Sequence, residues 1–153
     1  MHRFVLFRDR PRPVQILLGG VVPALIGVLA GWLIGTSAAG YWIVSAVAGV
    51  GGFLAGFEHR DGWGGADRGM VGGAIFGTAL VLTHWAIGNH EKVSMGSSRV
   101  FFVITIAIIG ILLGALGGRI ARHHREKAGV YITDEYLPGG DKYVERPEAE
   151  RAA

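Results

Sequence analysis

Four long apolar runs without any Asp, Glu, Lys or Arg constrain the fold of this chain most strongly. They cover residues 14–34, 41–57, 69–87 and 100–118. At about 1.5 Å per residue, a helix over each run is roughly 26 to 31 Å long, close to the thickness of a bilayer's hydrocarbon core. Lipid offers the backbone no hydrogen-bond partners, so a chain that crosses it is helical. The sequence therefore predicts an all-α integral membrane protein, a bundle of four transmembrane helices.

Small residues recur at every fourth position of these runs. The four series, here called the glycine ridges, are Gly27, Gly31 and Gly35; Ala48, Gly52 and Gly56; Gly69, Gly73 and Gly77; and Gly110, Gly114 and Gly118. In water each glycine weakens a helix by about 1 kcal/mol relative to alanine, but in lipid a strip of small residues lets a second helix approach closely. A four-residue step keeps each series near one helix face. We predict that the ridges pack helices within this bundle, between copies of the chain, or against a larger membrane complex.

The distribution of Lys and Arg predicts the orientation. The five segments around the runs, up to Lys127, carry 4, 0, 2, 2 and 4 of these residues. The alternate segments that share a side of the membrane therefore hold 10 against 2. Basic residues are retained on the cytoplasmic side. We expect a multi-pass protein of the cell membrane with both termini, and the segment at residues 58–68, in the cytoplasm.

Charged segments flank the predicted membrane domain of residues 14–120. Residues 1–13 are a basic cytoplasmic segment in which Pro11 and Pro13 end any helix. A basic start before an apolar run is also typical of a secretory signal, although the apolar region of a signal is shorter, about 7 to 15 residues. Residues 119–127 are interpreted as a basic extension of the last helix.

The C-terminal tail, residues 128–153, carries 3 Lys or Arg against 6 Asp or Glu. Its charge and its Pro and Gly content are typical of a segment without a packed core. We expect a mostly disordered acidic tail in the cytoplasm, where a soluble partner can reach it. A small hairpin around residues 138–140 is the alternative.

A charged segment follows the second run and is the first candidate site. Glu58, His59, Asp61 and Asp67 offer two kinds of metal-ligating or acid-base groups in one short stretch. The glycine-rich stretch at residues 62–66 predicts a flexible loop there. The alternative interpretation is that these residues, with Arg68, are solvated charges that end helices and pair with one another or with lipid headgroups.

His84 is the second candidate, because it lies inside the third apolar run. An ionisable group within a membrane is a functional candidate, and histidine titrates near neutral pH. His90 and Glu91 follow closely enough to join it in a site at the outer face. The alternative is a histidine that bonds to interfacial water or a backbone carbonyl.

The sequence excludes several function classes. It contains no cysteine and no recognisable hydrolase, metalloprotease, P-loop or dinucleotide motif. No stretch has the composition of a nucleic-acid-reading surface. We therefore predict no catalytic residue, metal or cofactor, and interpret the chain as a structural or interaction subunit. The alternatives are an oligomeric channel or transporter, with a kink at Pro23 and His84 near its path, and a membrane enzyme or metal-binding protein that uses the 58–67 segment.

Overall fold

The computed structural model describes residues 6–7, 10–88, 90–127, 130–132 and 143–145. Four helices in this part are long and apolar enough to cross a membrane, which confirms that element of the predicted fold. Their bounds are Arg12–Thr36, Ala38–Phe57, Gly62–Ile87 and Arg99–Lys127. Many large apolar side chains on these helices are exposed, including Trp42, Val100 and Phe101. A surface of this kind is typical of helices that face lipid.

The first crossing helix has three segments: α1 (Arg12–Ile16), a π-helical turn η2 (Leu17–Val21) and α2 (Val22–Thr36). The irregular turn lies directly before Pro23, where the sequence predicted a kink. Proline has no N–H, so the carbonyl of Gly19, four residues earlier, loses its usual α-helical donor. Within the π turn the Val22 N–H donates to Leu17, five residues back, so the next carbonyl, that of Leu18, also faces the missing N–H of Pro23.

Short turns join the next helices. Ser37 alone separates α2 from α3 (Ala38–Phe57), and its Oγ accepts the Gly40 N–H at 3.1 Å. The segment predicted as a flexible loop up to Arg68 is much shorter in the structure. α4 (Gly62–Ile87) begins directly after Asp61, whose carboxylate accepts the Gly64 N–H at 2.9 Å. This N-cap, together with the packing of the first turns of α4 against α5, makes the glycine-rich stretch helical.

α4 ends at Gly88, which has a left-handed φ of 69°. The segment after it folds back over the end of α2: the Lys92 N–H donates to Ile34 and its Nζ donates to Thr36, at 3.0 and 2.7 Å. The same segment places Met95 in a buried cluster. The members of this core, at the α2–α3 end of the molecule, are Ala30, Ile34, Tyr41, Phe76, Leu80 and Met95.

α5 (Arg99–Lys127) runs without interruption through the predicted basic extension. Beyond it, β1 (Val130–Ile132) pairs antiparallel with β2 (Tyr143–Glu145), and Tyr131 lies opposite Val144. These two strands correspond to the hairpin alternative for the tail. The remainder of the tail, which we predicted to be disordered, lies outside the described residues.

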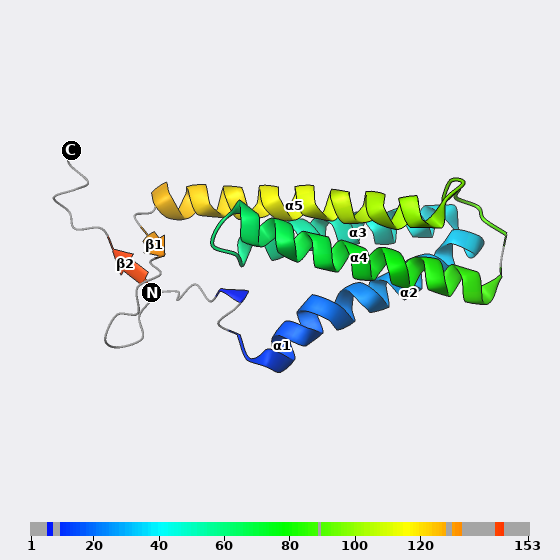
Figure 1. Ribbon diagram of the computed structural model, residues 1–153, viewed down its shortest axis with the longest axis horizontal. Helices are drawn as coiled ribbons and strands as arrows, with labels where there is room; N and C mark the ends of the chain where they lie inside the picture. The colour runs from blue at the N-terminus through cyan, green and yellow to red at the C-terminus, as the bar shows by residue number, and fades with distance from the viewer. Residues whose placement is uncertain (1–5, 8–9, 89, 128–129, 133–142, 146–153) are drawn as a thin grey trace.

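Figure 1 shows how the helices are arranged. α3, α4 and α5 run alongside one another, and α5 contacts both α3 and α4. α2 meets α4 near the α2–α3 turn, whereas α1 diverges from the other helices at the opposite end.

Candidate functional site

Glycines bring α4 and α5 into direct backbone contact. A methyl group added at Gly69 would overlap the carbonyl of Gly110, and one added at Gly110 would overlap that of Gly69. Gly65 and Gly114 have the same relation one turn along. At Gly73 the added methyl would lie 3.0 Å from the Ile106 carbonyl oxygen. At the first two pairs only glycine fits, because any Cβ would push the helices apart, whereas at Gly73 a small shift of the neighbour decides.

The other helices approach in the same way at some ridge positions. Methyl groups at Gly27 and Gly31 would overlap the carbonyls of Phe76 and Leu80 on α4. On the α3–α5 side, a methyl at Gly56 would overlap the carbonyl of Gly114. Gly118 lies against the backbone of the α3–α4 turn, where an added methyl would meet the carbonyl of Asp61. Gly77 has looser contacts, at 3.4 Å or more, and Gly35 lies in the last turn of α2.

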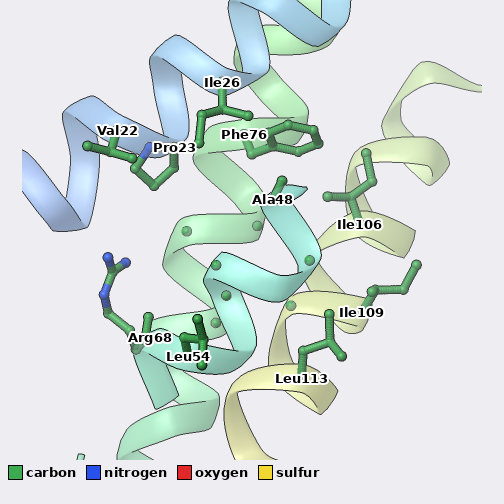
Figure 2. Close-up of a pocket in the computed structure, with 18 of the residues that line it drawn as sticks. Val22, Pro23, Ile26, Ala48, Leu54, Arg68, Phe76, Ile106, Ile109 and Leu113 are labelled. Atoms are coloured by element: carbon green, nitrogen blue, oxygen red, sulfur yellow. The ribbon is translucent and has the colours of Figure 1, made fainter. Parts of the chain in front are cut away.

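The ridge on α3 is different, because its middle position is open. A Cβ at Gly52 would meet nothing within 4 Å, and the same holds for its neighbour Gly51. Both line a cavity of about 470 Å³ between α2, α3, α4 and α5. Figure 2 shows Pro23 and Ile26 on one side of this cavity and Ile106 and Ile109 on the other. Its walls are mainly apolar, so it is a place for an apolar ligand.

Arg68 is the cation in the wall of this cavity (Figure 2). Its guanidinium donates to the carbonyls of Leu18 and Gly19, the second of these at 3.3 Å. These are the two carbonyls that lose their usual donors because of η2 and Pro23. Arg68 therefore adds hydrogen bonds to the irregular turn. The solvated-charge interpretation had Arg68 pair with a carboxylate or a headgroup, but it forms no ion pair with a carboxylate of the described residues.

Residues from the N-terminal segment close one end of the cavity. Leu6 is buried, and the Phe7 N–H donates to the Glu58 carbonyl at 2.9 Å. The Phe7 ring stacks on His59 at 5.6 Å and lies 5.1 Å from the guanidinium carbon of Arg68. Sequence reasoning treated this segment as a generic basic start, and the docking of its aromatic residue depends on a tertiary contact.

The residues of the predicted 58–67 site do not form one cluster, and their surroundings differ. Glu58 forms an ion pair with Arg10 at 2.6 Å, Asp61 caps α4, and Asp67 is exposed. The Nδ1 of His59 lies 3.0 Å from the Ala55 carbonyl. Among the described residues, no three His, Cys, Asp or Glu side chains are placed to share a metal ion.

Burial lowers the pKa of His59 below its usual 6.5, and the charge of Arg68 lowers it further. The Ala55 carbonyl and the charges of Glu58 and Asp61 oppose this effect without cancelling it. His59 therefore favours its neutral form, in which Nδ1–H donates to Ala55.

His84 is buried, with an exposed fraction of 4 %. Its Nε2 lies 3.8 Å from a Glu91 oxygen, so the structure brings together two of the three residues expected at the outer face. The Glu91 carboxylate accepts a hydrogen bond from the Met95 N–H at 3.3 Å. The third residue, His90, is exposed. The Nδ1 of His84 has no hydrogen-bond partner among the described residues. The pair joins α4 to the segment that covers the core.

Arg125 is a second structural cation that the sequence did not single out. It is buried and donates to the carbonyls of Phe57, His59 and Arg60, at 3.2, 2.7 and 2.9 Å. A cation at the end of α3 satisfies its last carbonyls and complements the helix dipole. Arg125 therefore ties the α3–α4 turn to α5.

No protein-family model, curated protein or solved structure matches this chain. The function must therefore be argued from the site. Its features are an apolar cavity between α2, α3, α4 and α5, one fixed cation at its end, and no constellation of acid, base and nucleophile among the residues that line it.

The sequence interpretation gave no role in the site to Phe7 or Arg125, and it treated Arg68 only as a solvated charge. A signal for Arg68 was nonetheless present. Pro23 in an apolar run implies that the Gly19 carbonyl loses its usual donor, and a buried carbonyl needs a donor. Arg68 is the last charged residue before the third run, but nothing in the sequence places it beside the first run.

Proposed function

We propose that this chain is a non-enzymatic interaction subunit of the membrane that binds the apolar chain of a lipid in the cavity beside α3. The observation that carries the proposal is the open position at Gly52, next to ridge glycines that other helices cover. An apolar cavity of about 470 Å³ is in the usual range of ligand pockets, roughly 300 to 1,000 Å³.

The shape of the cavity favours a single chain as its occupant. Its lining runs from Tyr41 along α3 to Glu58, just after the helix, which is roughly 25 Å. Spread over this length, its volume of about 470 Å³ gives a mean cross-section of roughly 19 Å², so the cavity is long and narrow. A path of this length lies within a hydrocarbon core of about 30 Å.

We further propose that the covered glycine ridges pack this chain's own bundle rather than an oligomer. The overlaps at Gly27, Gly31, Gly65, Gly69 and Gly114 support this, because each involves another helix of the same chain. A surface already in contact with its own backbone is not available to a second copy.

For the orientation, we propose that both termini are cytoplasmic. The distribution of Lys and Arg supports it, with 10 on one side against 2 on the other. The Arg68 end of the cavity then lies in the cytoplasmic leaflet. A soluble partner at the tail, an oligomeric channel or transporter, and an enzyme or metal site at residues 58–67 stay predictions. Their tests are a pull-down without residues 128–153, flux in liposomes, and the metal content of the purified protein.

Photo-crosslinking tests the binding proposal. The protein is reconstituted with a phospholipid that carries a diazirine in one acyl chain, and the crosslinked peptides are mapped by mass spectrometry. We expect crosslinks on α3, α4 and α5 at residues that line the cavity. Gly52→Leu fills the cavity and should remove most of them.

Ala46→Leu is the matched control, because Ala46 is exposed on the same helix and does not line the cavity. It should leave the crosslinks unchanged. Crosslinks spread evenly over the exposed faces of the helices, with no effect of Gly52→Leu, would overturn the proposal.

A further inference from the structure

We infer that the bound lipid is a phosphate-bearing glycerolipid, held with its phosphate beside Arg68 and one acyl chain along α3. The inference rests on the proposed function and adds the chemical class of the ligand. It starts from the charges at one end of the cavity.

The end of the cavity at Arg68 has an excess of positive charge. Glu58 and Arg68 both line it. Glu58 pairs with Arg10 at 2.6 Å and its charge also acts on Arg68, so among the described residues here one carboxylate faces two guanidinium groups. The Nε of Arg68 has no hydrogen-bond partner among the described residues. An anionic group is the complement of this end of the cavity.

Arg68 is held at the depth of a headgroup. It lies six residues into α4, roughly 9 Å from the start of that helix. Its bonds to the Leu18 and Gly19 carbonyls fix the guanidinium beside η2, so it does not need to reach out to the water. The irregular turn before Pro23 thus determines where a phosphate would lie.

Beyond Arg68 the cavity offers an apolar path for the chain attached to such a headgroup. Val22, Pro23 and Ile26 line it on the first crossing helix, and Ile109 and Leu113 line it on α5. Phe76 and the side chains of Tyr41 and Trp42 line its far part, at the α2–α3 end. A polar end followed by a long, narrow apolar wall is the pattern of a single lipid.

The test compares two lipids that differ only in the phosphate headgroup. Delipidated protein in detergent is titrated with dioleoylphosphatidylglycerol or with dioleoylglycerol, and bound lipid is counted by native mass spectrometry. We expect one site with about tenfold preference for the phosphatidylglycerol, the size of one charge-assisted hydrogen bond.

Variants of Arg68 assign the preference to that side chain. Arg68→Gln should remove the preference, so that phosphatidylglycerol binds no better than dioleoylglycerol, whereas Arg68→Lys should keep most of the preference because it keeps the charge. Arg122→Gln, on the exposed part of α5, is the control and should behave as wild type.

The outcomes separate this inference from the proposed function. Equal binding of both lipids to the wild type, or a preference that survives Arg68→Gln, would overturn the headgroup inference while the cavity still binds a chain. If neither lipid responds to Gly52→Leu, the proposed function fails as well. If Arg68→Gln also loses dioleoylglycerol binding, the affinities of the wild type decide. A preference of the wild type for phosphatidylglycerol over dioleoylglycerol below about twofold contradicts the inference.

Discussion

The glycines of this molecule differ in whether they tolerate a larger side chain, because some lie against the backbone of another helix and others face open space. Gly69 and Gly110 lie against each other's carbonyls on α4 and α5. Gly52 belongs to an equally regular ridge and has nothing within 4 Å of its missing Cβ. The identical residue type is thus required at one position and dispensable at another.

We predict that Gly69→Ala lowers the free energy of unfolding by about 3 kcal/mol, because the added methyl forces two backbones apart. Gly52→Ala should leave the stability unchanged or raise it by up to about 1 kcal/mol through helix propensity. Unfolding of both variants by SDS titration in detergent micelles measures the difference. Equal effects of the two substitutions would contradict the assignment of these positions.

His59 gives a residue-scale prediction for pH. Its pKa is lowered in the folded protein, so between that value and the usual 6.5 the unfolded chain binds more protons than the folded one. Stability contributed by neutral His59 is complete above pH 6.5 and is lost as the pH falls through this window. Thermal unfolding followed from pH 7.5 to 4.5 should show the loss.

The control for this titration is His59→Phe, which keeps an aromatic ring against Phe7 and cannot titrate. We expect a shallower decline of stability with falling pH than in the wild type. Because the other histidines are common to both proteins, the difference between the two profiles belongs to His59. Identical profiles would show that the lowered pKa has no effect on stability.

At the scale of elements, two arginines donate hydrogen bonds to backbone carbonyls at places where a helix ends or becomes irregular. Arg68 donates to the Leu18 and Gly19 carbonyls beside Pro23. Arg125 donates to one carbonyl at the end of α3 and to two in the α3–α4 turn. In both cases a donor from one helix satisfies the backbone of another, as buried backbone groups require. The conformation of the irregular turn therefore depends on α4, and that of the α3–α4 turn depends on α5.

We predict that Arg125→Met loosens the α3–α4 turn, because the carbonyls of Phe57, His59 and Arg60 lose a buried donor. The stability should fall by about 2 to 3 kcal/mol, the cost of losing charge-assisted hydrogen bonds. Hydrogen exchange at residues 58–64 should become faster. Arg122→Met removes an exposed pair with Glu126 and should change neither measurement. Protection at residues 58–64 that survives Arg125→Met would contradict this role.

For the whole molecule, the covered ridges predict a monomeric bundle. Native mass spectrometry in detergent should give the mass of one chain, 16.3 kDa plus bound lipid. Gly114→Leu should keep this mass and lower the unfolding temperature, because Gly114 contacts α3 and α4 of the same chain. A defined oligomer that Gly114→Leu dissociates would instead make the ridge a surface between subunits.

Much of the architecture could be predicted from residue patterns alone. Four apolar runs, each about as long as a bilayer is thick, require four helices because lipid cannot satisfy an open backbone. The candidate residues Glu58, His59, Asp61 and His84 were also visible as charged or titratable groups in unusual places. The helix prediction is confirmed because it depends on local composition and on the solvent of the segment, whereas a role for the candidate residues stays a prediction.

Which residues meet was decided by the tertiary structure. Spacing makes Gly52 and Gly56 equivalent, yet Gly56 contacts α5 and Gly52 lines a cavity, because the first crossing helix diverges from α3. Arg68 finds its acceptors on a helix about 50 residues earlier. The sequence alone determined the number and type of the long apolar helices through local hydropathy. The pairing of backbones and the open cavity depend instead on the angles between helices, and contacts between residues distant in sequence set these angles.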